Sequence, residues 1–240
     1  MRRALFVAAV LAAVLPCAPS ARAGVVIGAT RVVVPSTARD VTVRLSNKRD
    51  TPALVEAWIA PEAASDGAPA FVVAPTLFRM EAGRAQTVRV HRTQVPLPDD
   101  RETLFWLHVL DIPPNPAATP DAPQMKIAVR SRIKVFHRPA GLQGDAAQAP
   151  SRVTWSTMGN RLRIDNPTPF HVVLARVSLG GERMAALDGT TLPPFSQQAF
   201  ALEDTHAVAL RKDAGVAFAF VNDSGGSETR DARVTLDAGS

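Results

Sequence analysis

Short stretches in which hydrophobic and polar residues alternate recur along the chain, and this period of two is typical of β-strands with one buried face. Val41 to Leu45 and Ala85 to His91 alternate in this way, and no long segment keeps the spacing of an amphipathic helix. The 20 prolines and 14 glycines are spread between these runs, where they predict turns. The pattern therefore predicts an all-β protein.

Two further stretches are hydrophobic almost throughout. Val25 to Val34 is rich in β-branched residues and predicts one strand. Thr103 to Leu110 is nearly all apolar and predicts a strand buried on both faces. In the strand expected from Ala53 to Ile59, we expect Leu54 and Trp58 to lie in the core.

The most informative strand runs from about Met125 to Val135, after a loop rich in Pro, Ala and Thr at Pro113 to Pro123. Its residues divide into two sets, with Met125, Ile127, Val129, Ile133 and Val135 on one parity and Lys126, Arg130, Arg132 and Lys134 on the other. Because side chains alternate between the faces of a strand, this predicts one apolar face and one cationic face.

The segment from Gln143 to Pro150 is polar, bears Ala, Gly and Pro, and is the expected linker between domains. Beyond it the same succession of short strands and turns repeats, with turn signals at Asn166 to Pro169 and at Gly180-Gly181. We therefore expect two all-β domains, at residues 24–142 and 143–240.

The first 23 residues have the pattern of a secretory signal peptide. Arg2 and Arg3 precede the apolar run Ala4 to Leu15, and Ala21-Arg22-Ala23 supplies the small-residue cleavage pattern. The alternative, a membrane anchor, is disfavoured because the apolar run falls short of the roughly 20 residues that span a bilayer. We expect cleavage at residue 23, export to the periplasm and no membrane insertion afterwards.

Removal of this segment changes the charge and the cysteine content of the chain. It takes away three arginines and no acid, so the formal net charge falls from +5 to +2, and it removes Cys17, the single cysteine. The remaining charge gives little reason to expect nucleic-acid binding. The mature chain has no disulfide and no thiolate metal site although it enters an oxidising compartment.

The sequence contains no recognisable catalytic motif, and we expect no enzyme, no catalytic residue and no cofactor. Among five scattered histidines, His108 lies in an apolar strand, where a core histidine paired to a neighbour is favoured over a copper or zinc ligand. Two alternatives stay open: a periplasmic metal-binding sandwich that uses His91, His108 and His137, and a secreted hydrolase with a non-local triad.

Arg31 and Lys134 are long cations inside otherwise apolar strands. Burying an unpaired charge is costly. Either the two side chains face solvent at a sheet edge, where lysines discourage unwanted strand pairing, or they await an anion from a partner.

Eight segments occur in a fixed order along essentially the whole mature chain: Ala29-Thr-Arg-Val32, Pro52 to Ile59, Phe71 to Arg79, Asp100 to Trp106, Ile127 to Pro139, Asn166 to Pro169, Leu192 to Phe195 and Phe220 to Asp223. Taken together in this order, they resemble the PapD-type periplasmic pilus chaperones. The family usually has Asn at the position of His108, and some members carry a disulfide in domain two that this chain cannot form. The short loop from Pro113 to Pro123 resembles the branch of the family with a short F1–G1 loop.

This resemblance implies two immunoglobulin-like β-sandwiches set at an angle, with a cleft between them. It also implies binding of pilus or fimbrial subunits by donor-strand complementation, in which the chaperone lends a strand to an incomplete sandwich. Met125, Ile127 and Val129 would fill the groove of the subunit, and Arg31 and Lys134 would hold its C-terminal carboxylate.

The resemblance further implies a buried charge cluster between the domains, formed by Glu102, Arg138 and Asp223. Its partners would be pilus subunits and an outer-membrane usher, and the unloaded chain could pair with a second copy. One question stays open, because ordinary alternation places Lys134 and Val129 on opposite faces. Either a bulge or a cleft reached from the other face must reconcile them.

Overall fold

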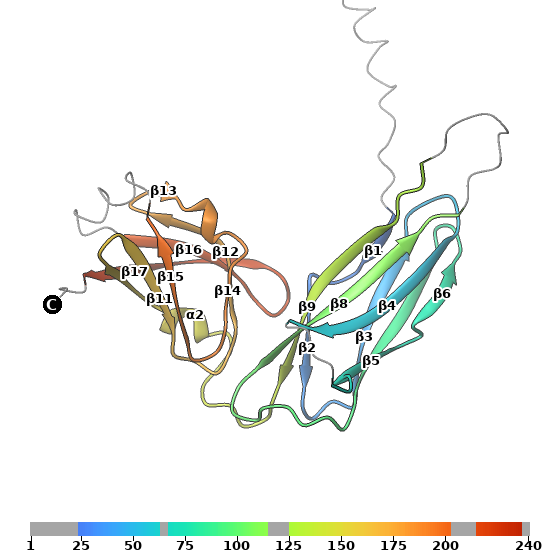
Figure 1. The fold of residues 1–240 in the computed structure, drawn as a ribbon, viewed down its shortest axis with the longest axis horizontal. Helices are drawn as coiled ribbons and strands as arrows, with labels where there is room; N and C mark the ends of the chain where they lie inside the picture. The colour runs from blue at the N-terminus through green and yellow to red at the C-terminus, as the bar shows by residue number, and fades with distance from the viewer. Residues whose placement is uncertain (1–23, 63–66, 115–124, 203–214, 237–240) are drawn as a thin grey trace, which may run out of the picture.

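The computed structural model describes residues 24–62, 67–114, 125–202 and 215–236. The expected signal peptide at residues 1–23 and most of the loop expected at Pro113 to Pro123 lie outside these ranges. The described residues form two β-sandwich domains set at an angle (Figure 1), which confirms the predicted fold class. Within the same ranges, no helix has both the length and the apolar character needed to cross a membrane.

Domain one is a sandwich of two sheets built from strands β1 to β9. One sheet has the order β1-β3-β7-β5, with β1 at Val25–Ile27, β3 at Asp40–Asn47, β7 at Ala85–Arg92 and β5 at Phe71–Ala74. The other has the order β2-β9-β8-β4-β6, with β2 at Arg31–Pro35, β9 at Val129–Arg138, β8 at Thr103–Ile112, β4 at Ala53–Pro61 and β6 at Leu77–Met80. Alternate residues of both sheets fill the core between them, among them Val43, Leu45, Val88, Val55, Leu107 and Val135.

The expected first strand is divided between the two sheets, so the prediction of one strand is wrong. Strand β1 pairs with β3, whereas β2 pairs with β9 in the opposite sheet. The chain bends at Gly28, whose amide donates to the carbonyl of Arg44 over 2.8 Å. The first segment of the domain thereby covers an edge of each sheet.

Strand β8 is buried on one face only, contrary to the expectation from its composition. Its inward residues Phe105, Leu107 and Val109 lie in the core, and its outward residues Trp106, His108 and Leu110 are half-buried. In the adjacent strand β4, the expectation that Leu54 and Trp58 lie in the core is also wrong. Ala53, Val55 and Ala57 point inward, Leu54 is 42% exposed, and Trp58 is half-buried on the outer face.

Domain two forms the sheet order β13-β12-β16-β17-β10-β11-β15, with β14 paired to β12. Its elements are α2 (Ala149–Arg152), β10 (Thr154–Met158), β11 (Arg161–Asn166), β12 (Val172–Leu179), β13 (Glu182–Arg183), η1 (Ala185–Leu187), β14 (Thr191–Leu192), β15 (Ser196–Ala201), β16 (Gly215–Val221) and β17 (Ser227–Leu236). Strand β17 pairs with β16 through its first residues and then, in parallel, with β10. It thereby connects β12, β13, β14 and β16 with β10, β11 and β15.

The segment expected to be a polar linker is packed against domain two. Ala149 is buried in the core of that domain, and Leu142 and Ala146 contact the same core. Its polar residues face solvent while Ala146 and Ala149 are covered, which composition alone does not reveal. The two domains are therefore joined by a short connection that lies directly before Leu142.

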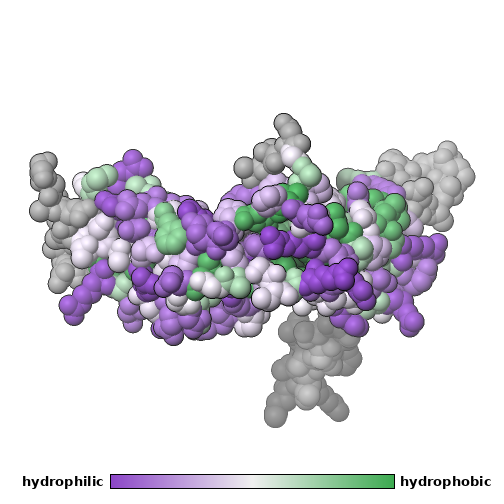
Figure 2. Space-filling model, turned by 90° about the horizontal axis from the view of Figure 1, so that it is seen from below, coloured by the Kyte–Doolittle hydropathy of each residue, from purple (hydrophilic) through white to green (hydrophobic). Residues whose placement is uncertain are grey.

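The lower surface of the molecule differs between the domains. Figure 2 shows hydrophobic side chains gathered on domain one near the junction, whereas domain two is mainly polar on this side. At the junction of the domains, an apolar hollow of about 690 Å³ is lined by Phe71, Leu97, Pro98 and Leu104 of domain one and by Pro193 and Pro194 of domain two.

A pair of substitutions on β8 tests the assignment of its faces. Leu107→Ala should lower the free energy of unfolding by about 2–5 kcal/mol, because it leaves a cavity in the core. Leu110→Ala on the outer face should cost about 1 kcal/mol or less. Urea denaturation followed by circular dichroism measures both, and equal losses would contradict the assignment.

Candidate functional site

Strand β9 has a partner along its full length on one side and along half of its length on the other. It pairs antiparallel with β8 from Val129 to His137, and it pairs in parallel with β2 only from Lys134 onward. Among the described strands, none pairs with the second edge of residues 129–133. This part of the edge presents backbone donors and acceptors to which another strand can add.

The pairing of β9 with β8 excludes one of the two explanations for the parity of Lys134 and Val129. The ladder between β8 and β9 contains no register shift. Ile133 and Val135 point into the core of domain one. Lys134 and Phe136 lie on the outer face, where Lys134 contacts Trp106 and Phe136 packs against Val173 of domain two. No bulge separates Val129 from Lys134, so the first explanation is excluded. That the cleft is reached from the outer face stays a prediction.

The residues expected to act as the donor strand lie at the start of β9 and before it. The structure begins the strand at Val129, not at Met125, and residues 125–128 pair with no other strand among the described residues. Met125, Ile127 and Val129 are 83%, 62% and 47% exposed. A row of exposed apolar side chains of this kind marks a surface that a partner can cover.

Arg31 begins strand β2 and is held at the junction of the domains. Its Nη1 donates to the carbonyl of Val221 in domain two over 2.8 Å, and its Cζ lies 5.5 Å from the ring centroid of Phe136. Its Nε is buried without a hydrogen-bond partner among the described residues. Burial lowers the pKa of Arg31, while the charges of Asp223 and Glu102 oppose this effect.

Lys134 lies directly beside Arg31 in the parallel register of β2 and β9. Its Nζ lies 5.2 Å from the ring centroid of Trp106, and it forms no ion pair with any residue that the structure describes. Burial lowers the pKa of Lys134, and the neighbouring charge of Arg31 lowers it further. Two half-buried cations side by side form a site that would favour an anion.

Glu102, Arg138 and Asp223 form a charge network between the domains. Nε of Arg138 donates to Glu102 over 2.6 Å, and its two terminal nitrogens donate to the carboxylate of Asp223 over 2.7 and 3.0 Å. Glu102 is 3% exposed. Burial alone would lower the pKa of Arg138, but the hydrogen bonds and charges of Asp223 and Glu102 outweigh it and raise that pKa.

Further contacts that the sequence did not predict join the domains. The backbone amide of His171 donates to Glu102 over 2.8 Å, and the amide of Glu102 donates to the carbonyl of Pro169 over 2.9 Å. An apolar cluster of Leu104, Phe136, Val173 and Val221 lies beside them. The backbone contacts leave no signal in the sequence, but Phe136 does, because it is an apolar residue on the cationic parity of its strand.

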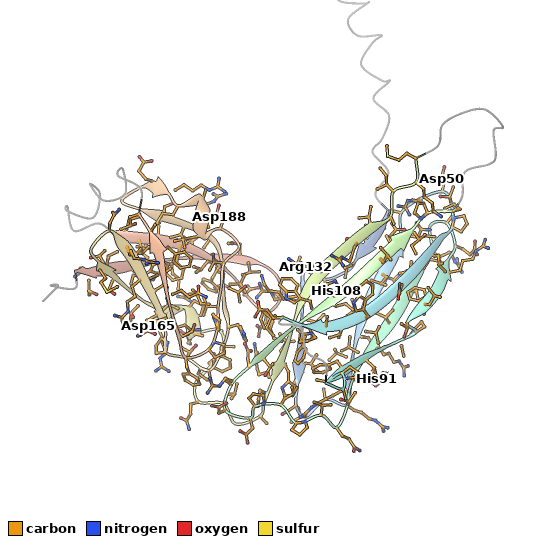
Figure 3. The ribbon with its side chains drawn as sticks, viewed as in Figure 1. Asp50, His91, His108, Arg132, Asp165 and Asp188 are labelled. Carbon is orange, nitrogen blue, oxygen red and sulfur yellow. The ribbon has the colours of Figure 1, made fainter. Side chains whose placement is uncertain are left out.

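A cavity of about 300 Å³ lies between the domains, and its lining includes Arg31, Arg138, His171 and Asp223. On the outer face of domain one, His108 and Arg132 lie close to the junction (Figure 3). The ring of His108 stacks on Trp58 with centroids 5.0 Å apart, and Cζ of Arg132 lies 4.5 Å from the ring centroid of Trp106. His108 is therefore a half-buried stacking partner, and the expectation of a core position was wrong.

The alternative of a metal site formed by His91, His108 and His137 is not supported. His91 lies in the opposite sheet, near the lower end of domain one (Figure 3), and contacts Asp40 over 3.7 Å. His137 is buried beside Phe71. Within the described ranges, no three acidic, His or Cys side chains are grouped to hold a metal ion.

Comparisons with known proteins identify similar chains. Residues 24–143 match the family described as "Pili and flagellar-assembly chaperone, PapD N-terminal domain", and residues 148–232 match "Pili assembly chaperone PapD, C-terminal domain". The probable fimbrial chaperone YadV of Escherichia coli K12 is 36% identical over 230 residues, which cover 90% of this chain and 92% of YadV. The chaperone protein FimB/FhaD of Bordetella pertussis is 40% identical over 191 residues, which cover 75% of this chain and 78% of that protein.

A solved structure of a chaperone is also similar to this chain. The Salmonella enterica SafB chaperone, in complex with the SafA pilin, superposes with a TM-score of 0.76 at 30% identity, covering 90% of this chain and 98% of SafB.

The charge network yields a prediction about stability. Arg138→Met should lower the free energy of unfolding by about 3–5 kcal/mol, because Glu102 then stays buried without its cation. Asp223→Asn should cost about 1 kcal/mol or less, because Asp223 is exposed. Chemical denaturation measures both, and the double variant Glu102→Gln/Arg138→Met should recover part of the loss. A loss for Arg138→Met no larger than that for Asp223→Asn would contradict this reading of the network.

Proposed function

Because the chain belongs to the PapD family of pilus assembly chaperones, we propose that it binds pilus subunits by lending them the open edge of strand β9. The observation that carries the proposal is the incomplete pairing of β9, which ends at the two cations Arg31 and Lys134. The complex of the related SafB chaperone with the SafA pilin supports subunits as the partner class.

The direction of strand β2 predicts where a bound strand ends. Strand β2 runs parallel to β9 and starts at Arg31, opposite Lys134. A subunit strand added in the same direction to residues 129–133 lies in line with β2, and its last residue meets Arg31. The C-terminal carboxylate then lies between the guanidinium of Arg31 and the ammonium of Lys134. Charge-assisted hydrogen bonds of this kind would fix the register of the added strand.

The donor residues supply the apolar part of the interaction. Met125, Ile127 and Val129 are exposed, and the core of domain one is complete without them. If a groove in the subunit buries all three, each contributes about 1.5–3 kcal/mol before the cost of ordering residues 125–128 is subtracted. The backbone edge provides affinity, and these side chains select the groove.

The resemblance to the family extends this proposal to the location of the chaperone and to its other partners. Export by the signal peptide expected at residues 1–23 would place the chaperone in the periplasm, where fimbrial chaperones of this family act. Delivery of subunits to an outer-membrane usher follows from the same resemblance. The open edge of β9 would also allow two unloaded chains to pair with each other. The proposed role requires no catalysis and no cofactor.

The anchor role of the two cations is tested by Arg31→Ala and Lys134→Ala, each expressed in the periplasm with a subunit. The subunit is the one that co-purifies with the wild-type chaperone. Both variants should fold, as judged by circular dichroism, yet the steady-state level of the subunit should fall at least tenfold, because loss of a charged hydrogen bond leaves the subunit unprotected. Arg89→Ala, an exposed arginine on the opposite sheet, is the control. Undiminished subunit levels in both anchor variants would overturn the carboxylate anchor.

The lowered pKa of Lys134 predicts a dependence of binding on pH. Binding of a carboxylate favours the charged lysine, so affinity should fall as the pH rises through the pKa of the free protein, which lies below the ordinary 10.5. Titration calorimetry with a peptide matching the C-terminus of the captured subunit measures the effect. The amidated peptide and Lys134→Arg should both lack this decline. An equal decline for the free acid and the amide would contradict the role of Lys134.

A further inference from the structure

One turn of domain two and the residue before it bind two arginines at the junction, Arg31 and Arg138. Residues 222–226 connect β16 to β17, and we call them the 222–226 turn. Val221, directly before this turn, accepts a hydrogen bond from Nη1 of Arg31 over 2.8 Å, and Asp223 within it binds Arg138 through both carboxylate oxygens. The anchor cation and the cation between the domains are therefore held by the same short segment.

The 222–226 turn is stiffened by its own hydrogen bonds. Oδ1 of Asn222 accepts from the amide of Gly226 over 2.8 Å and from the hydroxyl of Ser224 over 2.7 Å. Nδ2 of Asn222 donates to Glu228 over 2.8 Å, and the amide of Gly225 donates to the carbonyl of Asn222 over 2.9 Å. A turn so closed moves as one piece, so a displacement at Gly225 also displaces Val221 and Asp223.

The turn meets domain one at Thr30, the residue directly before Arg31. Gly225 has a φ of +85°, and a Cβ atom at this position would lie 2.1 Å from the hydroxyl of Thr30. Cβ atoms essentially never lie within 3.0 Å of another heavy atom, so a side chain at position 225 requires the turn or the side chain of Thr30 to shift. The close approach of the turn to the start of β2 thus depends on the absence of a side chain at Gly225.

We infer that Gly225 and Thr30 are positioning residues for carboxylate capture: their close contact places Val221 so that it orients the guanidinium of Arg31. With Nη1 held by the carbonyl of Val221, the unpartnered Nε and the remaining donors of Arg31 keep a fixed direction. A side chain added at Gly225 would act as a wedge against Thr30. It would separate Val221 from Arg31 and turn these donors away from the end of β9. This inference rests on the proposed function, since it concerns the same anchor.

Gly225→Ala introduces the wedge, and two further variants isolate its effect. Gly181→Ala is the matched control, because Gly181 also has a positive φ, of +91°, in a turn of domain two, with no atom within 4 Å of the added Cβ. It carries the same type of backbone strain without the contact. Thr30→Ala/Gly225→Ala removes the hydroxyl and leaves the Cβ of Thr30 at 3.4 Å, which relieves the wedge but not the strain.

The probe is the subunit that co-purifies with the wild-type chaperone, and the readouts are its affinity and the melting temperature of the free chaperone. Gly225→Ala should weaken subunit binding at least tenfold, the loss expected when one charge-assisted hydrogen bond is misaligned. Gly181→Ala should bind as the wild type does, although both single variants melt at lower temperature. The double variant should recover wild-type affinity while its melting temperature stays low.

Arg31→Ala in the same assay separates the inference from the function on which it rests. If Arg31→Ala binds the subunit as tightly as the wild type, the carboxylate anchor itself fails. If Arg31→Ala binds weakly but Gly225→Ala binds normally, or if the double variant does not recover, the positioning role is overturned. Equal weakening by Gly181→Ala would also overturn it, since strain alone would then account for the loss.

Discussion

Strand β2 covers only half of strand β9, and the remaining edge is the constraint on which the rest of the molecule depends. On the edge of β9 that faces away from β8, the backbone donors and acceptors of residues 129–133 have no strand partner among the described residues. Domain one tolerates this because its core is already filled by Ile133, Val135 and the residues of eight other strands. The protein can therefore lend the edge and the exposed side chains before it without unfolding.

The orientation of the two domains is tied to the same strand. Arg138 at the end of β9 joins Glu102 of domain one to Asp223 of domain two, and Phe136 packs on Val173. Buried ion pairs of this kind often add little net stability, but they fix geometry. Arg31 also donates to the carbonyl of Val221 in domain two. The position of the Arg31 guanidinium therefore depends on the angle between the domains.

Alternation of apolar and polar residues predicted the all-β fold, because it leaves a local pattern. The three members of the charge network were implied only by the resemblance to the pilus chaperones. The sequence pattern misassigned Leu54, Trp58 and the outer face of β8, because a half-exposed apolar face reads like a buried one. The contacts of Val221 and Gly225 could not be predicted. A backbone carbonyl and a missing side chain act across domains only once the fold has brought them together.

Amide hydrogen exchange of the chaperone with and without the captured subunit tests the central claim most directly. Residues 125–133 should become protected on binding, because their open edge gains a strand. Residues 134–138 should change little, because β8 and β2 already cover both of their edges. Protection confined to domain two, or none within residues 125–133, would contradict the account.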